Sequence, residues 1–466
     1  MSFLARSRSV AASVAASGLA LALSSMTVSA QDQTARLEKL IRDQQRQIEA
    51  LRREVGGIRT QNARRTPAAR NVVTKDGVVA KADDEPYVLK GGLPRSWRLP
   101  GTDIDVRIGG KVKADVIGRV GGDPSLGAED LFAVAAIDTR RTRIGDSAFR
   151  IHGRESRFNI EFSKKETPLG PARILLEGDF FGAAGNQIVS NSDSFRLRHA
   201  IVEVGPLLAG QWWTTFYDPG AYAETLDFAG AGGQTFIRQG VVRLQHRFAN
   251  GFSIAGAIEN PEGRVQFGPA AAVVSSRDTT PDFVGNIRYQ GAFGHIQLGG
   301  AVTQTNAPNG VSGDEVGYAG TLHGRLNLPF LAPKDNIRFQ ATYANGATRY
   351  IQETAGVTAG VLPSVFYNPA TGQAETQKTF GGYVAFQHWW TNELRSNLVY
   401  SYVRSDLPRF ASAVTFKHSQ YGAANLIWSP WADLDLGIEV QHGLREDRDN
   451  ARGRQTRVQS SATYRF

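Results

Sequence analysis

The chain has 466 residues, of which 41% are hydrophobic and 21% charged, and this composition excludes a purely disordered protein. A net charge of +9 and a pI of 9.7 raise the question of whether the protein binds nucleic acid or a membrane surface. Because the sequence contains no cysteine, disulfides, thiolate catalysis and cysteine-based metal sites are excluded.

Residues 1–30 predict an export signal. Two arginines precede an apolar stretch over 10–23, and small residues stand at positions 28 and 30, as a signal peptidase requires. We therefore expect the mature chain to begin at Gln31.

Residues 31–58 predict a short periplasmic coiled-coil helix. Seam positions recur at alternating steps of four and three residues: Leu37, Ile41, Gln44, Ile48, Leu51, Val55 and Ile58. Three heptads are close to the minimum that stays associated alone, so we expect this helix to join an oligomer held together elsewhere, and the sequence leaves its role open. Residues 59–100 lack periodicity and carry scattered charge, which predicts a linker.

From residue 101 to 466 the hydrophobic period becomes two. Over 104–120 every even position is apolar or small, and most odd positions are charged. Such a strand exceeds the usual length of about 5 to 6 residues. We expect sixteen strands at 103–120, 148–163, 170–182, 194–204, 207–216, 236–248, 251–260, 282–290, 293–304, 316–328, 336–347, 379–390, 393–404, 416–429, 432–444 and 455–466.

The connections between these strands alternate between short turns and longer polar loops. This arrangement is typical of a bacterial outer-membrane barrel with both termini on the short-turn side. The predicted fold is all-β: a sixteen-stranded antiparallel transmembrane β-barrel around an aqueous lumen. Aromatic residues near predicted strand ends are expected to form interfacial girdles, namely Trp212, Trp213, Tyr217, Trp389, Trp390, Trp428 and Trp431.

The strand predicted at 148–163 has an ambiguous phase. The apolar side chains of 158–162 stand at even positions, but so do Arg150, His152 and Arg154. Either a bulge near Glu155 turns these basic residues inward, or this half of the strand stands above the lipid.

Several short segments together resemble the DcaP-type trimeric porins of Gram-negative outer membranes. They are Ser96–Asp103 before Ile108–Asp115, Arg196–Ala200 before Gly210–Phe216, and Glu224–Phe228 before Phe236–Gln239. The terminal Phe466 also resembles the recognition signal of outer-membrane barrels. The family resemblance implies trimers, a third long loop folded into the pore, and passage of small anions such as dicarboxylates.

Basic residues on the polar strand faces are candidates for lining the pore and selecting anions: Lys111, Lys113, Arg173, Arg196, Arg198 and Arg243. The third long loop, 217–235, is expected to narrow the lumen, with its carboxylates Asp218, Glu224 and Asp227 facing basic strand residues. Cations around a low-dielectric constriction concentrate anions, and arginine can hold a carboxylate with two hydrogen bonds. The alternative is that the basic residues form structural ion pairs with Glu161, Glu177, Asp179 and Glu203 and select no solute.

The leading hypothesis is a passive diffusion channel that favours small anions. One alternative is a non-selective or sugar porin, which requires an aromatic track in the lumen that the sequence does not predict. Another is a barrel-anchored tether whose arm binds the cell wall, so that peptidoglycan is a further candidate partner. Because the chain has no G-x-S-x-G motif and its histidines lack metal-ligand spacing, we predict no enzyme, catalytic residue, metal or cofactor.

The positive charge lies mainly outside the predicted barrel. Residues 1–30 carry two arginines and no acidic residue, and residues 31–100 carry 15 basic and nine acidic residues, which leaves +1 for 101–466. We therefore expect no nucleic-acid partner. The expected partners are two further copies of the chain, small anionic solutes, and outer-membrane lipid and lipopolysaccharide. The basic run Asp138–Arg143 is expected either to face lipopolysaccharide or to be solvated. The predicted location is the outer membrane, with the N-terminal arm in the periplasm.

Overall fold

The computed structural model describes residues 89–120, 131–140, 149–183, 190, 192–277, 279–306, 314–356, 361–368 and 370–466, with scattered positions before residue 89. The chain divides into two compact units, 1–87 and 88–466. In the first unit residues 42, 43, 45–47, 49, 50 and 53 are helical, and β1 (Val72–Val73) pairs with β2 (Val79–Ala80). The predicted signal and the seam of the predicted coiled coil lie outside the described residues, so both remain predictions.

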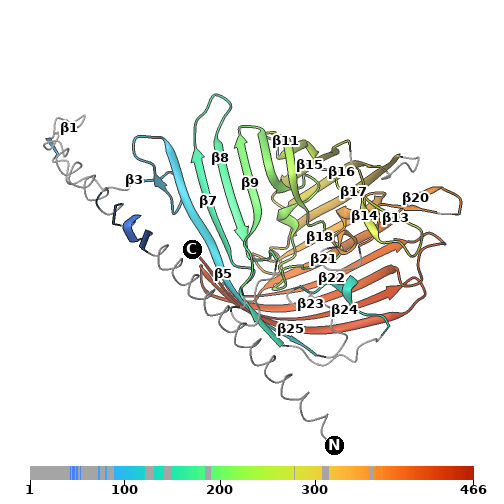
Figure 1. Ribbon diagram of the computed structural model, residues 1–466. Helices are drawn as coiled ribbons and strands as arrows, with labels where there is room; N and C mark the ends of the chain where they lie inside the picture. The colour runs from blue at the N-terminus through green and yellow to red at the C-terminus, as the bar shows by residue number, and fades with distance from the viewer. Residues whose placement is uncertain are drawn as a thin grey trace, which may run out of the picture. The chain divides into compact units, whose positions relative to one another are not determined.

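Within the described part of the second unit, sixteen antiparallel strands form a closed barrel, which confirms the predicted fold (Figure 1). The strands are β5 (Ile104–Arg119), β6 (Phe149–His152) with β7 (Arg157–Lys164), β8 (Ala172–Asp179), β9 (Arg196–Val204), β10 (Leu207–Trp213), β11 (Arg238–Arg247), β12 (Phe252–Glu259), β15 (Asp282–Gly291), β16 (Gly294–Asn306), β17 (Asp314–Asn327), β18 (Asn336–Asn345), β21 (Lys378–Trp389), β22 (Leu394–Asp406), β23 (Phe416–Trp431), β24 (Leu434–Asp447) and β25 (Arg452–Arg465). β25, red in Figure 1, runs beside the blue β5 and closes the barrel, with Tyr464 opposite Val112.

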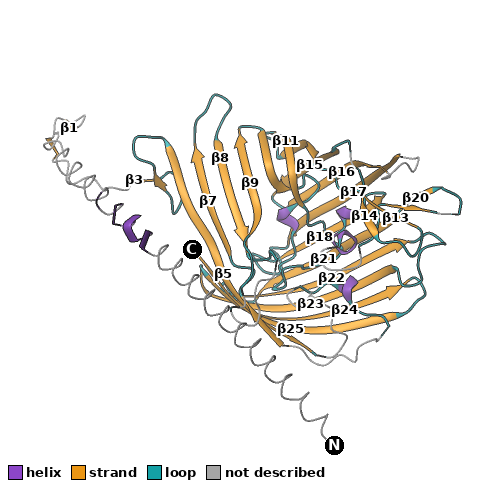
Figure 2. Cartoon of the chain, in the orientation of Figure 1, coloured by secondary structure: helices purple, strands orange, loops and turns teal. Residues whose placement is uncertain are grey.

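Smaller elements decorate the barrel (Figure 2). β3 (Leu89–Lys90) and β4 (Trp97–Arg98) continue the sheet beside β5. A separate four-stranded sheet contains β13 (Arg264–Phe267), β14 (Val273–Ser275), β19 (Val365–Tyr367) and β20 (Ala374–Thr376). Short helices are η1 (Val134–Ala136), η2 (Pro219–Ala221), η3 (Thr348–Tyr350) and α2 (Gln352–Ala355). None of the described helices is long and apolar enough to cross a membrane.

The period-two pattern decides which side chains face outward. In β5, Val112 is 60% exposed on the outer surface, whereas its neighbour Lys113 is only 4% exposed and points into the barrel. The register carries this alternation around the barrel, because residues opposite each other on paired strands share a face. The outer surface is therefore an apolar belt, and the polar face lies inside.

A bulge resolves the ambiguous phase of the second barrel strand. β6 places Phe149 and Ile151 outward, whereas β7 places Phe158 outward. The register of β5 shifts by one residue between these halves, since Asp115 faces His152 and Lys111 faces Arg157. Of the two sequence-based alternatives, the bulge is thus the one that occurs. It turns Arg150 and His152 to the inner face.

Candidate functional site

The third long connection, residues 214–237, folds into the barrel and is called L3 below. Thr214 N donates a hydrogen bond to the Ile237 carbonyl oxygen across 3.1 Å, which closes the neck of the loop. Phe216 and Ala231 are fully buried. L3 therefore narrows the lumen.

Each of the three carboxylates predicted in this loop reaches a cation on the barrel wall. Asp218 lies 2.6 Å from Arg288 and 2.7 Å from His295. Glu224 accepts hydrogen bonds of 2.9 and 2.6 Å from the Arg395 guanidinium. Asp227 pairs with Arg457, and both partners are deeply buried. These contacts connect L3 to β15, β16, β22 and β25.

The backbone of L3 is also held by the wall. Lys113 Nζ donates to the Leu226 carbonyl oxygen across 2.5 Å, and the Leu226 N–H donates to Glu439 across 2.8 Å. At Gly233 a Cβ atom would lie 2.4 Å from the carbonyl oxygen of Gly382. A side chain at position 233 would push the loop away from β21, because the two backbones touch there.

Most of the basic residues selected from the sequence are neutralised by neighbouring carboxylates. Five of the six take part in ion pairs, which are Lys111 with Glu155, Lys113 with Glu155 and Asp115, Arg173 with Glu203, Arg196 with Asp179, and Arg198 with Glu177 and Asp179. Arg243 is the exception: within the described residues it has no ion pair, and its buried Nε has no hydrogen-bond partner. The wall of β5–β9 therefore carries many cations but little uncompensated charge.

An aromatic cluster lines the constriction, contrary to the expectation that the lumen has no aromatic track. Trp213 lies 4.8 Å from both Tyr217 and Phe236, and Tyr222 lies 6.0 Å from Phe236, measured between ring centroids. These rings border a cavity of about 330 Å³ that Lys111 and Arg157 also line. The sequence did not predict this aromatic cluster, because L3 brings its residues together in the lumen and no single strand carries them.

The girdle prediction fails for four of its seven residues. Trp212 packs 4.2 Å from the His199 ring on the inner face, and Trp213 and Tyr217 line the constriction. Trp389 lines a second cavity near the short turns. The other three are exposed, as a girdle requires, with exposed fractions of 61% for Trp390, 47% for Trp428 and 55% for Trp431, and Trp431 also borders the second cavity.

Inward-facing cations without carboxylate partners lie elsewhere in the lumen. Arg325 of β17 stands directly opposite Arg338 of β18, and both line the second cavity, of about 900 Å³, together with Lys334. On another side of L3, Arg238 lies 5.1 Å from the Trp213 ring. Within the described residues none of these four forms an ion pair. Arg325 and Arg338 occupy inward positions of two paired strands, so the period-two pattern of the sequence is a signal that places both in the lumen.

Two described carboxylates without a cation partner are covered by protein. Glu259 is 2% exposed and accepts a hydrogen bond of 2.6 Å from Thr215 N at the neck of L3. Glu439 is fully buried and accepts from the backbone of L3 and from Asn425 across 2.8 Å. Neutral donors thus satisfy these two carboxylates, and neither faces the open lumen.

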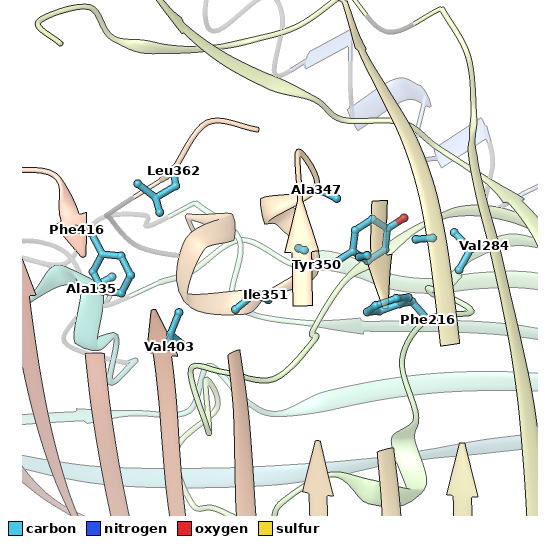
Figure 3. Packing of buried hydrophobic residues seen from close by; sticks show 12 residues of the cluster. Ala135, Phe216, Val284, Ala347, Tyr350, Ile351, Leu362, Val403 and Phe416 are labelled. Carbon is cyan, nitrogen blue, oxygen red and sulfur yellow. The ribbon is translucent and has the colours of Figure 1, made fainter. Parts of the chain in front are cut away.

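The short helix α2 binds L3 from the long-loop side. Gln352 N and Glu353 N of α2 donate to the L3 carbonyl oxygens of Gln234 and Gly232 across 2.8 and 2.9 Å. Figure 3 shows Tyr350, beside α2, facing Phe216 of L3, and their ring centroids lie 4.8 Å apart. Burial raises the pKa of the Glu353 carboxyl from 4.5 to about 7, although this group accepts a hydrogen bond from Ala135 N.

The first long loop contributes to the same end of the barrel. Arg140 pairs with Asp449 across 2.7 Å, and Thr139 bonds to Asp447. The described part of the predicted basic run is therefore bound to the loop between β24 and β25, while residues 141–143 lie outside the described residues. Throughout the described residues, no group of three His, Asp or Glu side chains is placed to hold a metal ion.

Comparisons with known proteins agree with this architecture. The family model described as Porin subfamily matches residues 97–458. The outer-membrane channel DcaP of Acinetobacter baumannii has a similar structure, with a TM-score of 0.66 and 22% identity over 78% of this chain and 97% of that one. OmpF of Salmonella typhi gives a TM-score of 0.49 and 13% identity over 78% and 98% of the two chains. OmpT of Vibrio cholerae gives 0.49 and 10% over 79% and 99%. No curated protein matches the sequence.

Proposed function

The chain belongs to the porin subfamily, and from this membership we propose that its barrel is a passive outer-membrane channel for small hydrophilic solutes that favours anions such as dicarboxylates. The strands supply an aqueous lumen, and L3 supplies the constriction at which solutes are discriminated. The proposal concerns the sign of the charge that passes most easily.

The observation that carries the anion preference is an asymmetry between unpaired charges. Cations without carboxylate partners, such as Arg325 and Arg338, line an open cavity. Among the described carboxylates without cation partners, Glu259 and Glu439 are covered by L3, and Glu393, in an exposed turn, is the single one that lines that cavity. A solute in the lumen therefore meets a net positive field, because paired charges largely cancel at a distance.

Arginine also suits carboxylate solutes in particular. Its planar guanidinium offers two parallel donors to the two oxygens of one carboxylate. The contact of Arg395 with Glu224, made through two hydrogen bonds of 2.9 and 2.6 Å, is an example within this lumen. A solute carboxylate meets the same geometry at a guanidinium whose partner is missing.

We extend the proposal to the assembly and its surroundings. The exposed apolar belt of the barrel suits outer-membrane lipid and lipopolysaccharide as neighbours. The family resemblance supports a homotrimer, the seam pattern over 31–58 supports a periplasmic arm that associates between copies, and peptidoglycan remains a candidate partner of that arm. Mass determination of the detergent-solubilised assembly tests the oligomer number.

The reversal potential in a planar bilayer tests the anion preference. Under a potassium chloride gradient, we expect the zero-current voltage to lie toward the chloride equilibrium potential. A value toward the potassium equilibrium potential contradicts the proposal.

A second candidate function, a channel for neutral sugars, is favoured by the aromatic cluster at L3. Trp213, Tyr222 and Phe236 border the constriction cavity, and sugar rings stack on such faces. Liposome swelling distinguishes the two functions: a sugar channel admits disaccharides faster than dicarboxylates of similar size, and an anion channel gives the opposite order.

A further inference from the structure

The vestibule on the short-turn side of L3 is bounded by both the loop and the turns. Its cavity of about 900 Å³ is lined by the turn residues Asn392 and Ala432 and by Arg465 near the chain end. Tyr222 and Glu224 of L3 also line it, and they line the constriction cavity as well. A solute that passes L3 therefore enters this vestibule directly.

Two of the three carboxylates that line the vestibule are already occupied by cations. Glu224 binds Arg395 through two hydrogen bonds of 2.9 and 2.6 Å. Asp435 lies 3.1 Å from Arg395 and 2.5 Å from Arg465. The third, Glu393, stands in an exposed turn between β21 and β22.

The remaining cations come from one hairpin and have no such partners. Arg325 and Arg338 are directly opposite each other on β17 and β18, a placement that disfavours the fold because like charges repel. Arg338 donates only to neutral acceptors, the Tyr222 carbonyl oxygen at 2.7 Å and the amides of Asn336 at 2.9 Å and Gln387 at 3.3 Å. The buried Nε of Arg325 has no hydrogen-bond partner within the described residues.

Lys334 adds a third cation from the turn that joins β17 to β18. Its Nζ lies 4.4 Å from the centroid of the Trp389 ring, which also contacts Arg395 on the vestibule wall. A cation–π contact positions an ammonium group without neutralising its charge. The hairpin thus presents three positive groups to the same cavity, and no carboxylate within the described residues pairs with any of them.

We propose that Arg325, Lys334 and Arg338 form an anion-binding site, at the short-turn exit of the channel, that takes oxyanions with two or more negative charges. The proposal deepens the proposed function and rests on it. A multivalent anion supplies the missing counter-charge to both guanidinium groups and to the ammonium group, and so offsets their mutual repulsion. A chloride ion carries a single negative charge and compensates only one of the three groups.

Such a site makes the channel asymmetric. An anion held in the vestibule lies on one side of L3, so a bulky multivalent anion reaches it without crossing the constriction only from the short-turn side. Inorganic tripolyphosphate is a suitable probe, because it carries several negative charges and is much larger than chloride.

Single-channel recordings with tripolyphosphate added to one side at a time test the proposal. We expect the half-blocking concentration from the more sensitive side to be about tenfold lower than from the other side, as for the gain of one or two charge-assisted hydrogen bonds. The double variant Arg325→Gln with Arg338→Gln should abolish this difference. The variant Arg247→Gln removes one cation at the same end of the barrel but on β11. Its ratio of half-blocking concentrations between the two sides should stay within about twofold of the wild-type ratio.

Equal block from both sides, or a double variant that blocks like the wild type, overturns the exit site. These outcomes are separate from those of the proposed function, because the wild-type reversal potential in potassium chloride is measured without the probe. If the double variant fails to form a barrel, Lys334→Gln takes its place. That substitution lies in an exposed turn and should reduce the difference between the two sides about threefold; an unchanged difference overturns the site.

Discussion

Two walls of the lumen carry basic residues in opposite settings. On the wall of β5–β9, Arg198 and Lys113 each contact carboxylates of that wall, at 2.8 and 3.3 Å for Asp179 and Asp115. On the wall of β17–β18, Arg325 faces Arg338, and neither has a carboxylate partner within the described residues. The electric field in a pore therefore follows from its unpaired charges and cannot be deduced from the number of cations on its surface.

The largest effect expected from this difference is on stability. Arg198→Gln leaves Glu177 and the fully buried Asp179 with fewer partners, and losing one member of a buried ion pair costs about 3–5 kcal/mol. Arg325→Gln removes a repulsion and should change the free energy of unfolding by less than about 1 kcal/mol. Urea unfolding in lipid vesicles measures both. Equal losses would show that the two walls do not differ in this way.

The next effect concerns Glu353, a buried carboxyl that has no cation in direct contact within the described residues. Because its pKa in the fold is about 7, above the ordinary 4.5, the folded protein holds its proton more tightly than the unfolded chain. The docking of α2 on L3 should therefore be strongest in acid, weaken as the pH rises above about 4.5 and level off above about 7, with a loss of up to about 3 kcal/mol.

Hydrogen exchange of the Gln352 and Glu353 amides, corrected for intrinsic rates, measures this loss between pH 5 and 8. Glu353→Gln is the matched control, since it keeps the shape of the side chain without the titration. Protection that rises with pH in the wild type, or the same pH dependence in the variant, contradicts the prediction.

A smaller effect is expected on ion selectivity. Replacing Arg325 and Arg338 by glutamine should lower the chloride-to-potassium permeability ratio about threefold, because two uncompensated charges leave the lumen. Replacing a whole ion pair of the other wall, Arg173→Gln with Glu203→Gln, should leave the ratio nearly unchanged. Reversal potentials give the permeability ratio of each double variant. A larger change for the Arg173–Glu203 variant than for the Arg325–Arg338 variant would contradict the prediction.

The smallest effect tests whether a compensated region can be converted into an uncompensated one. Glu224→Gln keeps an acceptor for Arg395 but removes the charge that this guanidinium contacts at 2.6 Å. The anion preference should rise about twofold. A fall in the same reversal-potential measurement would mean that Glu224 does not screen Arg395 in the open lumen.

The sequence predicted the barrel well because strand alternation is local. The apolar residues at even positions of β5 and the charged residues between them were enough to assign Val112 to the outside and Lys113 to the inside. The same pattern assigns Arg325 and Arg338 to the lumen. It did not distinguish them from Arg198, because pairing with a carboxylate depends on the register of neighbouring strands.

The site was less predictable where L3 was involved. Trp213 and Tyr217 stand near a strand end, which suggested a membrane girdle, but the loop turns them into the constriction. The bulge between β6 and β7 likewise set the direction of Arg150 and His152. Both outcomes depend on contacts with strands that are distant in sequence.

A period of two fixes the two faces of every strand, so the sixteen-stranded barrel with a polar lumen follows from local sequence alone. The tertiary structure alone decided which lumen charges remain uncompensated. Asp227 meets its cation 230 residues away at Arg457, and a contact of that range exists only after the barrel closes and L3 folds across it. The cations that remain unpaired after the barrel closes are the basis of the proposed preference for anions.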